Sequence, residues 1–187
     1  MIASIENSSD DLRPAPIRFK AQVVPATREN LRGDLKYVFE YWTELRGSRF
    51  APSFEEFDWA RVPRRLSPQI AVVEVRRNPL DFVYTQWGIG RVVMQGGDYT
   101  GRSVRDFKPQ GIAEKAIHEY SEVVKLKCAI CVQTEQLETD TSAPFDYQFL
   151  RLPFSNNGDE VNQILSIGLY DEMVMSRALN FYGTQPK

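Results

Sequence analysis

The sequence predicts an α+β domain built on a five-stranded antiparallel sheet, with short helices and one long helix on one face and an amphipathic helix before it. The first observation is a hairpin, because Ile70–Val75 and Phe82–Trp87 alternate with period two and Asn78-Pro79 supplies a turn. The second is a set of alternating segments after residue 128, joined by loops short enough for hairpins. The third is a helical periodicity over residues 110–127, which separates the two groups of strands.

Composition and charge favour one cytoplasmic domain without a nucleic-acid or membrane partner. The chain has 187 residues, 42% of them hydrophobic, which suits a single domain with a core and extensions. Its net charge of −2 gives no excess that would attract nucleic acid or an anionic membrane. No apolar segment approaches the length of a membrane span, the start lacks a signal sequence, and two cysteines agree with a reducing compartment.

The N-terminal part is expected to consist of a flexible leader, residues 1–26, and a helix, residues 27–47. The leader mixes polar residues and prolines and has few large apolar groups to bury. Thr27 or Asn30 can cap the helix, which ends at Gly47. Its apolar stripe can simply dock on the sheet or can also form part of a homodimer interface, because large aromatic residues are enriched at interfaces. The interface candidates are Leu35, Val38, Phe39, Trp42 and Leu45.

Residues 48–175 are expected to form the rest of the domain, beginning with an ordered arm over 48–69. The arm contains three prolines with aromatic residues between them, which leaves room only for a short helical turn. Strands are expected at about 70–76 and 81–88. The glycines that follow lack the Gly-Lys-Ser/Thr ending of a phosphate-binding loop and come after a hairpin, so nucleotide binding there is not expected.

The second half is expected to contain the long helix, three strands and a loosely held tail over 176–187. In the helix, apolar side chains gather on one face, whereas Lys115 and the only histidine, His118, lie on the polar face. The strands are expected at about 129–138, 145–154 and 161–172. A β-bulge is expected near Phe149–Arg151, where the alternation changes phase.

No catalytic or metal-binding residues are predicted. Cys128 and Cys131 have the spacing of zinc and redox pairs, but structural zinc needs two further ligands that the chain does not readily supply. In a strand, positions three apart project to opposite faces, so the two thiols should diverge. No Ser-His-Asp order and no paired carboxylates are evident in the sequence.

The order of short motifs along the chain resembles one family. The motifs are Trp42, Arg46-Gly47, Arg49 and Pro52, then Phe57-Asp58, Arg65-Leu66 and Pro68, then Phe82-Val-Tyr, Gly88 and Gly97-Asp-Tyr-Thr-Gly-Arg102, and finally Leu152-Pro153-Phe-Ser. In this order and spacing they resemble the PAS-domain superfamily over roughly residues 35–170, in particular the single-domain PAS proteins of alphaproteobacteria. The resemblance implies a fold and a sensing role but leaves the ligand open, because PAS domains share an architecture while differing in what they bind.

What the resemblance implies is a non-enzymatic sensor or signalling module that binds a small molecule, a protein partner or both, and acts through dimer or helix rearrangement. The alternatives are an adaptor with a filled core, a haem-binding sensor and a small enzyme. Haem-binding PAS sensors take their axial histidine from the corresponding long helix, but an iron ligand must project into the cavity, and His118 is predicted to face away. Flavin is not expected either, because the Asn-Cys-Arg-Phe motif of light-oxygen-voltage sensors is missing.

A PAS fold places its ligand cavity between the sheet and the short helices. Candidate lining residues are Tyr84, Trp87, Arg91, Tyr99, Arg102, Phe107, Ile117, Tyr120 and Phe149. The two arginines are available for an anionic group. The alternative is that the aromatic residues fill the core completely.

Overall fold

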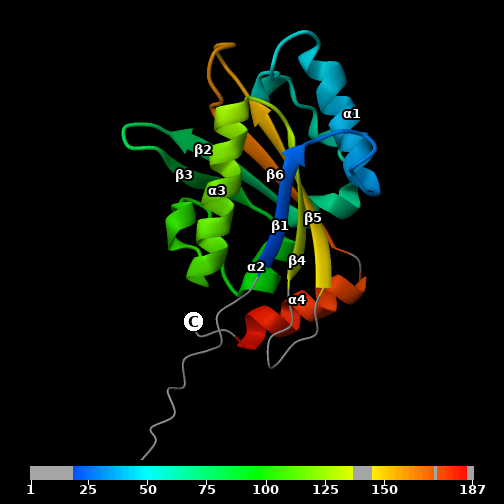
Figure 1. The fold of residues 1–187 in the computed structure, drawn as a ribbon, viewed down its shortest axis with the longest axis vertical. Coiled ribbons are helices and arrows are strands. Elements are labelled where there is room, and N and C mark those ends of the chain that lie inside the picture. Colours follow the sequence, from blue (N-terminus) through cyan, green and yellow to red (C-terminus); the bar gives the residue numbers. More distant parts are fainter. Residues whose placement is uncertain (1–18, 137–144, 171, 185–187) are drawn as a thin grey trace, which may run out of the picture.

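Six strands form one antiparallel sheet in the order β1-β4-β5-β6-β2-β3 (Figure 1). The computed structural model describes residues 19–136, 145–170 and 172–184. The strands are β1 (Phe19–Pro25), β2 (Ile70–Arg76), β3 (Asp81–Trp87), β4 (Ile130–Gln136), β5 (Phe145–Phe154) and β6 (Gln163–Leu169). The five strands predicted from alternation are therefore confirmed, two of them with the same bounds and the others within three residues at their ends.

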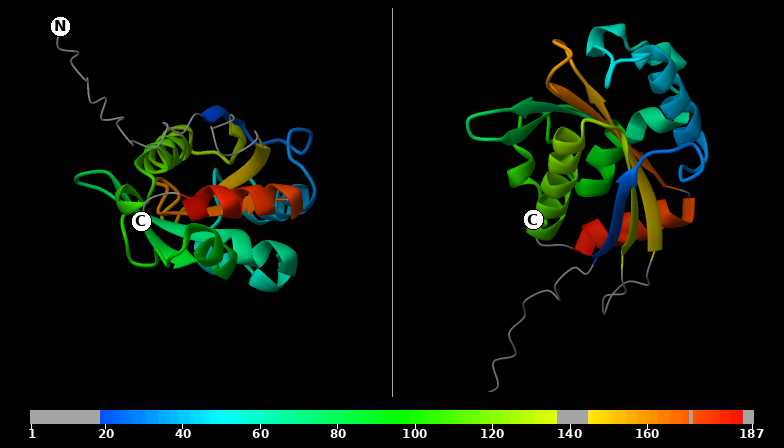
Figure 2. Two further views of the ribbon diagram at one scale, coloured as in Figure 1. Left: turned by 90° about the horizontal axis from the view of Figure 1, so that it is seen from below. Right: turned by 45° about the horizontal axis from the view of Figure 1, so that its top comes forward.

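Helices cover both faces of this sheet, and α4 crosses near the strand ends (Figures 1 and 2). The α-helices are α1 (Asp34–Arg46), α2 (Ile89–Gln95), α3 (Gln110–Leu126) and α4 (Glu172–Thr184). Short 3-10 helices lie at Phe54–Glu56, Trp59–Arg61, Arg64–Gln69 and Val104–Asp106. In the described part of the chain, no helix is long and apolar enough to cross a membrane.

The alternation of the strands divides the core into two clusters, one on each face. In β2, Ala71 and Val73 belong to the cluster under α2 and α3, which we call the α3-side core. Ile70 and Val72 belong to the cluster under α1 and the 48–69 arm, which we call the α1-side core. Successive side chains of a strand point to opposite faces, so a run of apolar residues such as Ile70–Val73 serves both cores.

Helix α1 packs its apolar stripe against its own sheet, which agrees with the first of the two alternatives, so its buried residues are not available to a homodimer interface, and the homodimer itself stays a prediction. Leu35, Val38 and Trp42 are no more than 3% exposed within the α1-side core, and Phe39 and Leu45 pack against it partly buried. The indole Nε1 of Trp42 donates to the carbonyl oxygen of Pro153 at 2.9 Å. The physical reason is that the second face of the sheet is itself apolar and α1 covers it.

Three other expectations need correction. The range predicted as leader contains β1, which pairs with β4 along its whole length, and the helix begins at Asp34 rather than Thr27. The range predicted as tail forms most of α4, in which Ala178 is 1% exposed. Strand β5 has no bulge, because its pairing with β4 and β6 runs without a shift, and the irregularity lies in β2 instead, between Val72 and Val73.

Candidate functional site

A small cavity lies in the α3-side core, between the sheet and helices α2 and α3. Its volume is about 40 Å³. One buried water needs roughly 10–15 Å³ of such space, so the cavity has room for about three waters. It is lined by Tyr84, Trp87, Arg91, Gln95, Phe107, Ile112, Lys115, Ala116, Glu119, Tyr120, Tyr147, Phe149, Arg151 and Tyr170.

Helix α2 forms one wall because the chain turns sharply at the end of β3. A Cβ at Gly88 would lie 2.4 Å from the carbonyl oxygen of Pro68, so only glycine allows the two segments to approach this closely. One and two turns into the helix, Arg91 and Gln95 lie on the face that meets the cavity. Val93, on the opposite face, is 65% exposed. The sequence around Gly88 therefore determines where the Arg91 guanidinium lies.

Arg91 is a buried cation that the protein holds through carbonyl and hydroxyl oxygens. Arg91 is only 5% exposed. Nε donates to the Gln69 carbonyl oxygen at 2.9 Å, and Nη2 donates to the Ser166 hydroxyl at 3.3 Å. The guanidinium also lies over the rings of Trp87 and Phe149, with its Cζ 5.1 and 5.3 Å from the ring centroids. Within residues 19–136, 145–170 and 172–184, no carboxylate forms an ion pair with Arg91.

A second charged group in the cavity wall is centred on Glu119 of α3, which is 0% exposed. Its carboxylate pairs with Lys115, one helical turn earlier, and with Arg151 of β5. Burial alone would raise the pKa of Glu119, but the two cations hold it below its ordinary value. Burial also lowers the pKa of Lys115. Arg151 completes the network by donating from Nη1 to the Ser166 hydroxyl at 2.8 Å.

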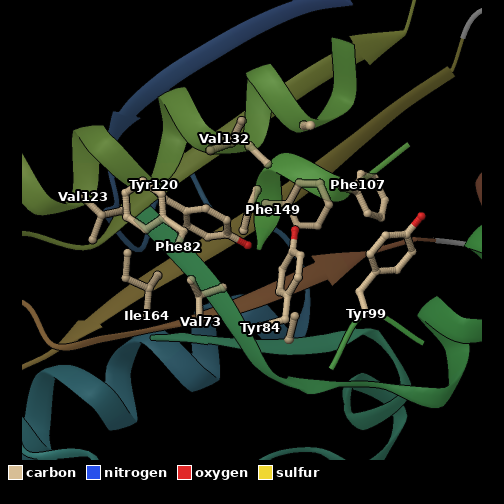
Figure 3. Close-up of a cluster of buried hydrophobic side chains, with 14 of the residues drawn as sticks. Val73, Phe82, Tyr84, Tyr99, Phe107, Tyr120, Val123, Val132, Phe149 and Ile164 are labelled. Carbon is tan, nitrogen blue, oxygen red and sulfur yellow. The ribbon is translucent and has the colours of Figure 1, made fainter. Parts of the chain in front are cut away.

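Tyrosine hydroxyls meet at the centre of the site. Tyr84 of β3 and Tyr120 of α3 point their hydroxyl groups toward one another (Figure 3). Burial raises the pKa of Tyr84 well above its ordinary value and that of Tyr170 to about 12. Both phenols therefore stay neutral at physiological pH and act as hydrogen-bonding groups.

Of the nine predicted ligand-binding residues, the structure brings six together around this cavity, namely Tyr84, Trp87, Arg91, Phe107, Tyr120 and Phe149. Tyr99 and Arg102 instead line a surface groove of about 630 Å³ between α2, the 96–109 segment and α4. Ile117 lines neither hollow and packs partly buried against the α3-side core. The alternative expectation, that aromatic residues fill the core completely, differs from the structure only by the remaining space of about 40 Å³.

Sequence reasoning missed the charged residues of the site, Lys115, Glu119 and Arg151. Lys115 was placed on the polar face of the helix, but its side chain is only 12% exposed and lies above the rings of Tyr147 and Phe149. The sequence did contain a sign that Arg151 faces the cavity. In an uninterrupted strand it alternates in step with Tyr147 and Phe149 and so points to the same face of the sheet. The predicted bulge concealed that phase.

The expectations about His118 and the cysteines agree with the geometry. His118 is exposed on the outer side of α3. Cys131 belongs to the α1-side core, and Cys128 packs against the α3-side core, so the two thiols do diverge. Burial raises the pKa of Cys131 to about 11, which leaves it an unreactive thiol. The part of the chain that is described holds no cluster of three or more residues suited to binding a metal ion.

Comparison with known proteins gives one family match. A family model described as a PAS domain matches residues 33–170, which is well over half of the chain. The comparison with curated proteins finds no match. Among solved structures, an RNA-binding Light-Oxygen-Voltage receptor is similar with a TM-score of 0.45 and 13% sequence identity. That likeness covers 90% of this chain and 44% of the receptor chain, so this chain spans less than half of the receptor's length.

Proposed function

Because the chain belongs to the PAS domain family, we propose that it is a non-enzymatic sensor module that binds a small molecule in the cavity of the α3-side core. The observation that supports this most is the lining of the cavity. Three cations and one carboxylate lie around a space with room for about three waters. Buried charges are expensive and occur mainly where they serve a site, so the lining favours a binding role over simple packing.

The small volume suggests how binding would be reported. Any ligand larger than the present space must push a wall outward, and α2, with seven residues, is the shorter of the two helices that form the wall. Helix α2 also packs against α4, and Tyr170 lines the cavity two residues before α4 begins. In the proposal, a ligand in the cavity changes the packing of α2 and Tyr170, whether or not it exceeds the present space, and the altered docking of α4 is what a signalling partner or a second copy of the chain detects.

A second candidate function is a protein-protein adaptor with a filled core. The observation that favours it is the cavity volume of about 40 Å³, which is smaller than most metabolites. The two functions differ in one property, because only the sensor has to bind a small molecule inside the domain.

A thermal-shift screen with a set of small metabolites tests the proposal. At a ligand concentration one hundred times the Kd, linkage adds about 2.7 kcal/mol, and each kcal/mol raises the Tm of a domain of this size by about 2–4 °C. A binder should therefore raise the Tm by roughly 5–11 °C and change hydrogen exchange in α4. No response to any compound would support the adaptor, and reproducible turnover of a ligand would show that the protein is an enzyme.

A matched pair of variants tests whether the ligand binds in this cavity. Ala116 lines the cavity, and Ala116→Leu adds three heavy atoms to a space for about three waters. This variant should fold but lose the ligand response. Ala60→Leu makes the same change at an exposed position of a 3-10 helix and should keep the response. An unchanged response in Ala116→Leu would put the ligand elsewhere.

A further inference from the structure

We propose that the ligand of this cavity is a small monocarboxylate held by Arg91, Arg151 and Trp87, an inference that rests on the proposed ligand-binding function. Formate and acetate represent the class. The inference follows from three properties of the cavity wall, which are its unused hydrogen-bond donors, its excess of positive charge and its size.

The unused donors are all N–H groups. Nε1 of Trp87 and Nε of Arg151 are buried without a hydrogen-bond partner, and both residues line the cavity. All hydrogen bonds of Arg91 within the described ranges use Nε or Nη2, which leaves Nη1 unused. A buried donor without a partner costs free energy, so the two at Trp87 and Arg151, beside the unused Nη1 of Arg91, indicate that the space takes an acceptor.

The cavity wall has fewer unused hydrogen-bond acceptors than unused donors. Among the cavity-lining residues of the described chain, the only buried acceptor without a partner is Oε1 of Gln95, whose amide can rotate to present its Nε2 donor instead. The Glu119 carboxylate is already shared by Lys115 and Arg151. The vacant hydrogen-bonding capacity is therefore almost entirely for an acceptor-only group, and an ionised carboxylate is such a group.

Charge separates a carboxylate from a neutral acceptor. Arg91 is 5% exposed and has no carboxylate partner among the residues that the structure describes. A buried cation is normally paired, because removal from water is costly, and the oxygens of Gln69 and Ser166 bring partial charges only. Waters could satisfy the donors but would leave the positive charge without a counter-ion. A carboxylate supplies both acceptors and charge.

The size of the space fixes the length of the acid. Room for about three waters matches the three heavy atoms of formate and nearly matches the four of acetate. The side chains of Phe107, Ile112 and Ala116 supply an apolar part of the wall that can receive a methyl group. A longer acid would have to displace the wall that α2 or α3 forms.

The indole proton of Trp87 provides a direct test by NMR. The uniformly ¹⁵N-labelled full chain is titrated with sodium formate and sodium acetate, against sodium chloride at equal ionic strength. The Trp87 indole signal is identified by its loss in Trp87→Phe. It should move and saturate with either carboxylate, because its Nε1 gains an acceptor. The indole of Trp42 is an internal control, since it already donates to the Pro153 carbonyl on the other face of the sheet and should not move.

Two comparisons separate the failure of this inference from the failure of the proposed function. Acetamide has the size of acetate without its charge and should not produce the shift. If acetamide moves the Trp87 signal and acetate does not, the cavity binds small molecules but the carboxylate inference is overturned. If acetate and chloride give the same result and neutral probes have no effect either, the donors hold only water and the inference is likewise overturned.

A matched pair of arginine variants tests the role of the charge. Arg91→Met should weaken acetate binding about ten- to hundredfold, the range expected for hydrogen bonds to a charged group. Arg64→Met removes an exposed arginine outside the cavity and should leave binding unchanged. Equal affinity in both variants would overturn the assignment of Arg91. If Arg91→Met does not fold, the wild-type titration with acetate and acetamide still decides the question.

Discussion

Replacement of Glu119 by glutamine tests whether the buried charge cluster is held together as the structure indicates. Glu119 is 0% exposed and pairs with both Lys115 and Arg151. Glu119→Gln keeps the size of the side chain but leaves the guanidinium of Arg151, which is 3% exposed, without its carboxylate. Removing one partner of a buried pair costs about 3–5 kcal/mol. For a chain of this length that loss corresponds to a fall in Tm of roughly 6–20 °C.

The assay is equilibrium unfolding in urea at several pH values, with the Tm as a second measure. A carboxyl group whose pKa is lowered in the folded state stabilises the protein above its unfolded pKa, and this stability is lost as the pH falls through the folded pKa. The ordinary value for glutamate is 4.5, and that of Glu119 is lowered on folding. The difference in unfolding free energy between wild type and Glu119→Gln should therefore stay constant near neutral pH and narrow below about pH 4.5.

Two controls sharpen the result. Glu122→Gln makes the same change one turn away on α3, where the carboxylate pairs with the largely exposed Lys125, and should cost less than about 1 kcal/mol. The triple replacement Lys115→Met, Glu119→Leu and Arg151→Met removes all three charges of the cluster and should recover most of the loss, because apolar groups of similar size fill such sites well. A cost for Glu119→Gln no larger than that of Glu122→Gln would refute the reasoning.

Three further predictions follow from the fold. Gly88→Ala should destabilise the domain by about 1–3 kcal/mol, since its Cβ would meet the Pro68 carbonyl oxygen, whereas Gly97→Ala, with no atom within 4 Å, should be nearly neutral in the same urea titration. A chain that begins at Gly47 loses β1 and α1, so the α1-side core loses Leu35, Val38 and Trp42, and the fragment should not unfold cooperatively. A fragment that does fold cooperatively would contradict this. Light scattering of the intact chain tests the homodimer prediction. The purified protein should show no haem absorption, and a haem band that disappears in His118→Ala would prove wrong the conclusion that this exposed histidine binds no iron.

Local patterns in the sequence were enough to predict strands β2 to β6 and the long helix α3. The alternation in Ile70–Val75 and Phe82–Trp87 depends only on neighbouring residues, and each side chain has to face one layer or the other. The same reasoning placed His118 on the outside of α3. The six predicted residues that do line the cavity were found because a PAS-like topology brings the hairpin and the long helix together.

The tertiary structure alone decided what covers the second face of the sheet. An apolar stripe on α1 fits a partner protein as well as the chain's own sheet, and the choice depends on whether that face is already covered. Strand β1 is similar, because its short and largely exposed sequence becomes a strand only where β4 offers an edge to pair with.

The charged residues of the cavity show most clearly what depends on the tertiary structure alone. Glu119 and Arg151 lie 32 positions apart, and Arg91 is placed by the close approach of Gly88 to Pro68. A charged residue in a sequence is normally solvated, so its type and local period predict a surface position. Only the packing of α3 on β5 removes water from these side chains and makes their pairing necessary. The sequence by itself therefore determined five of the six strands and the helices α1 and α3, whereas long-range packing decided that β1 and α4 form, which charges are buried and what they leave unpaired.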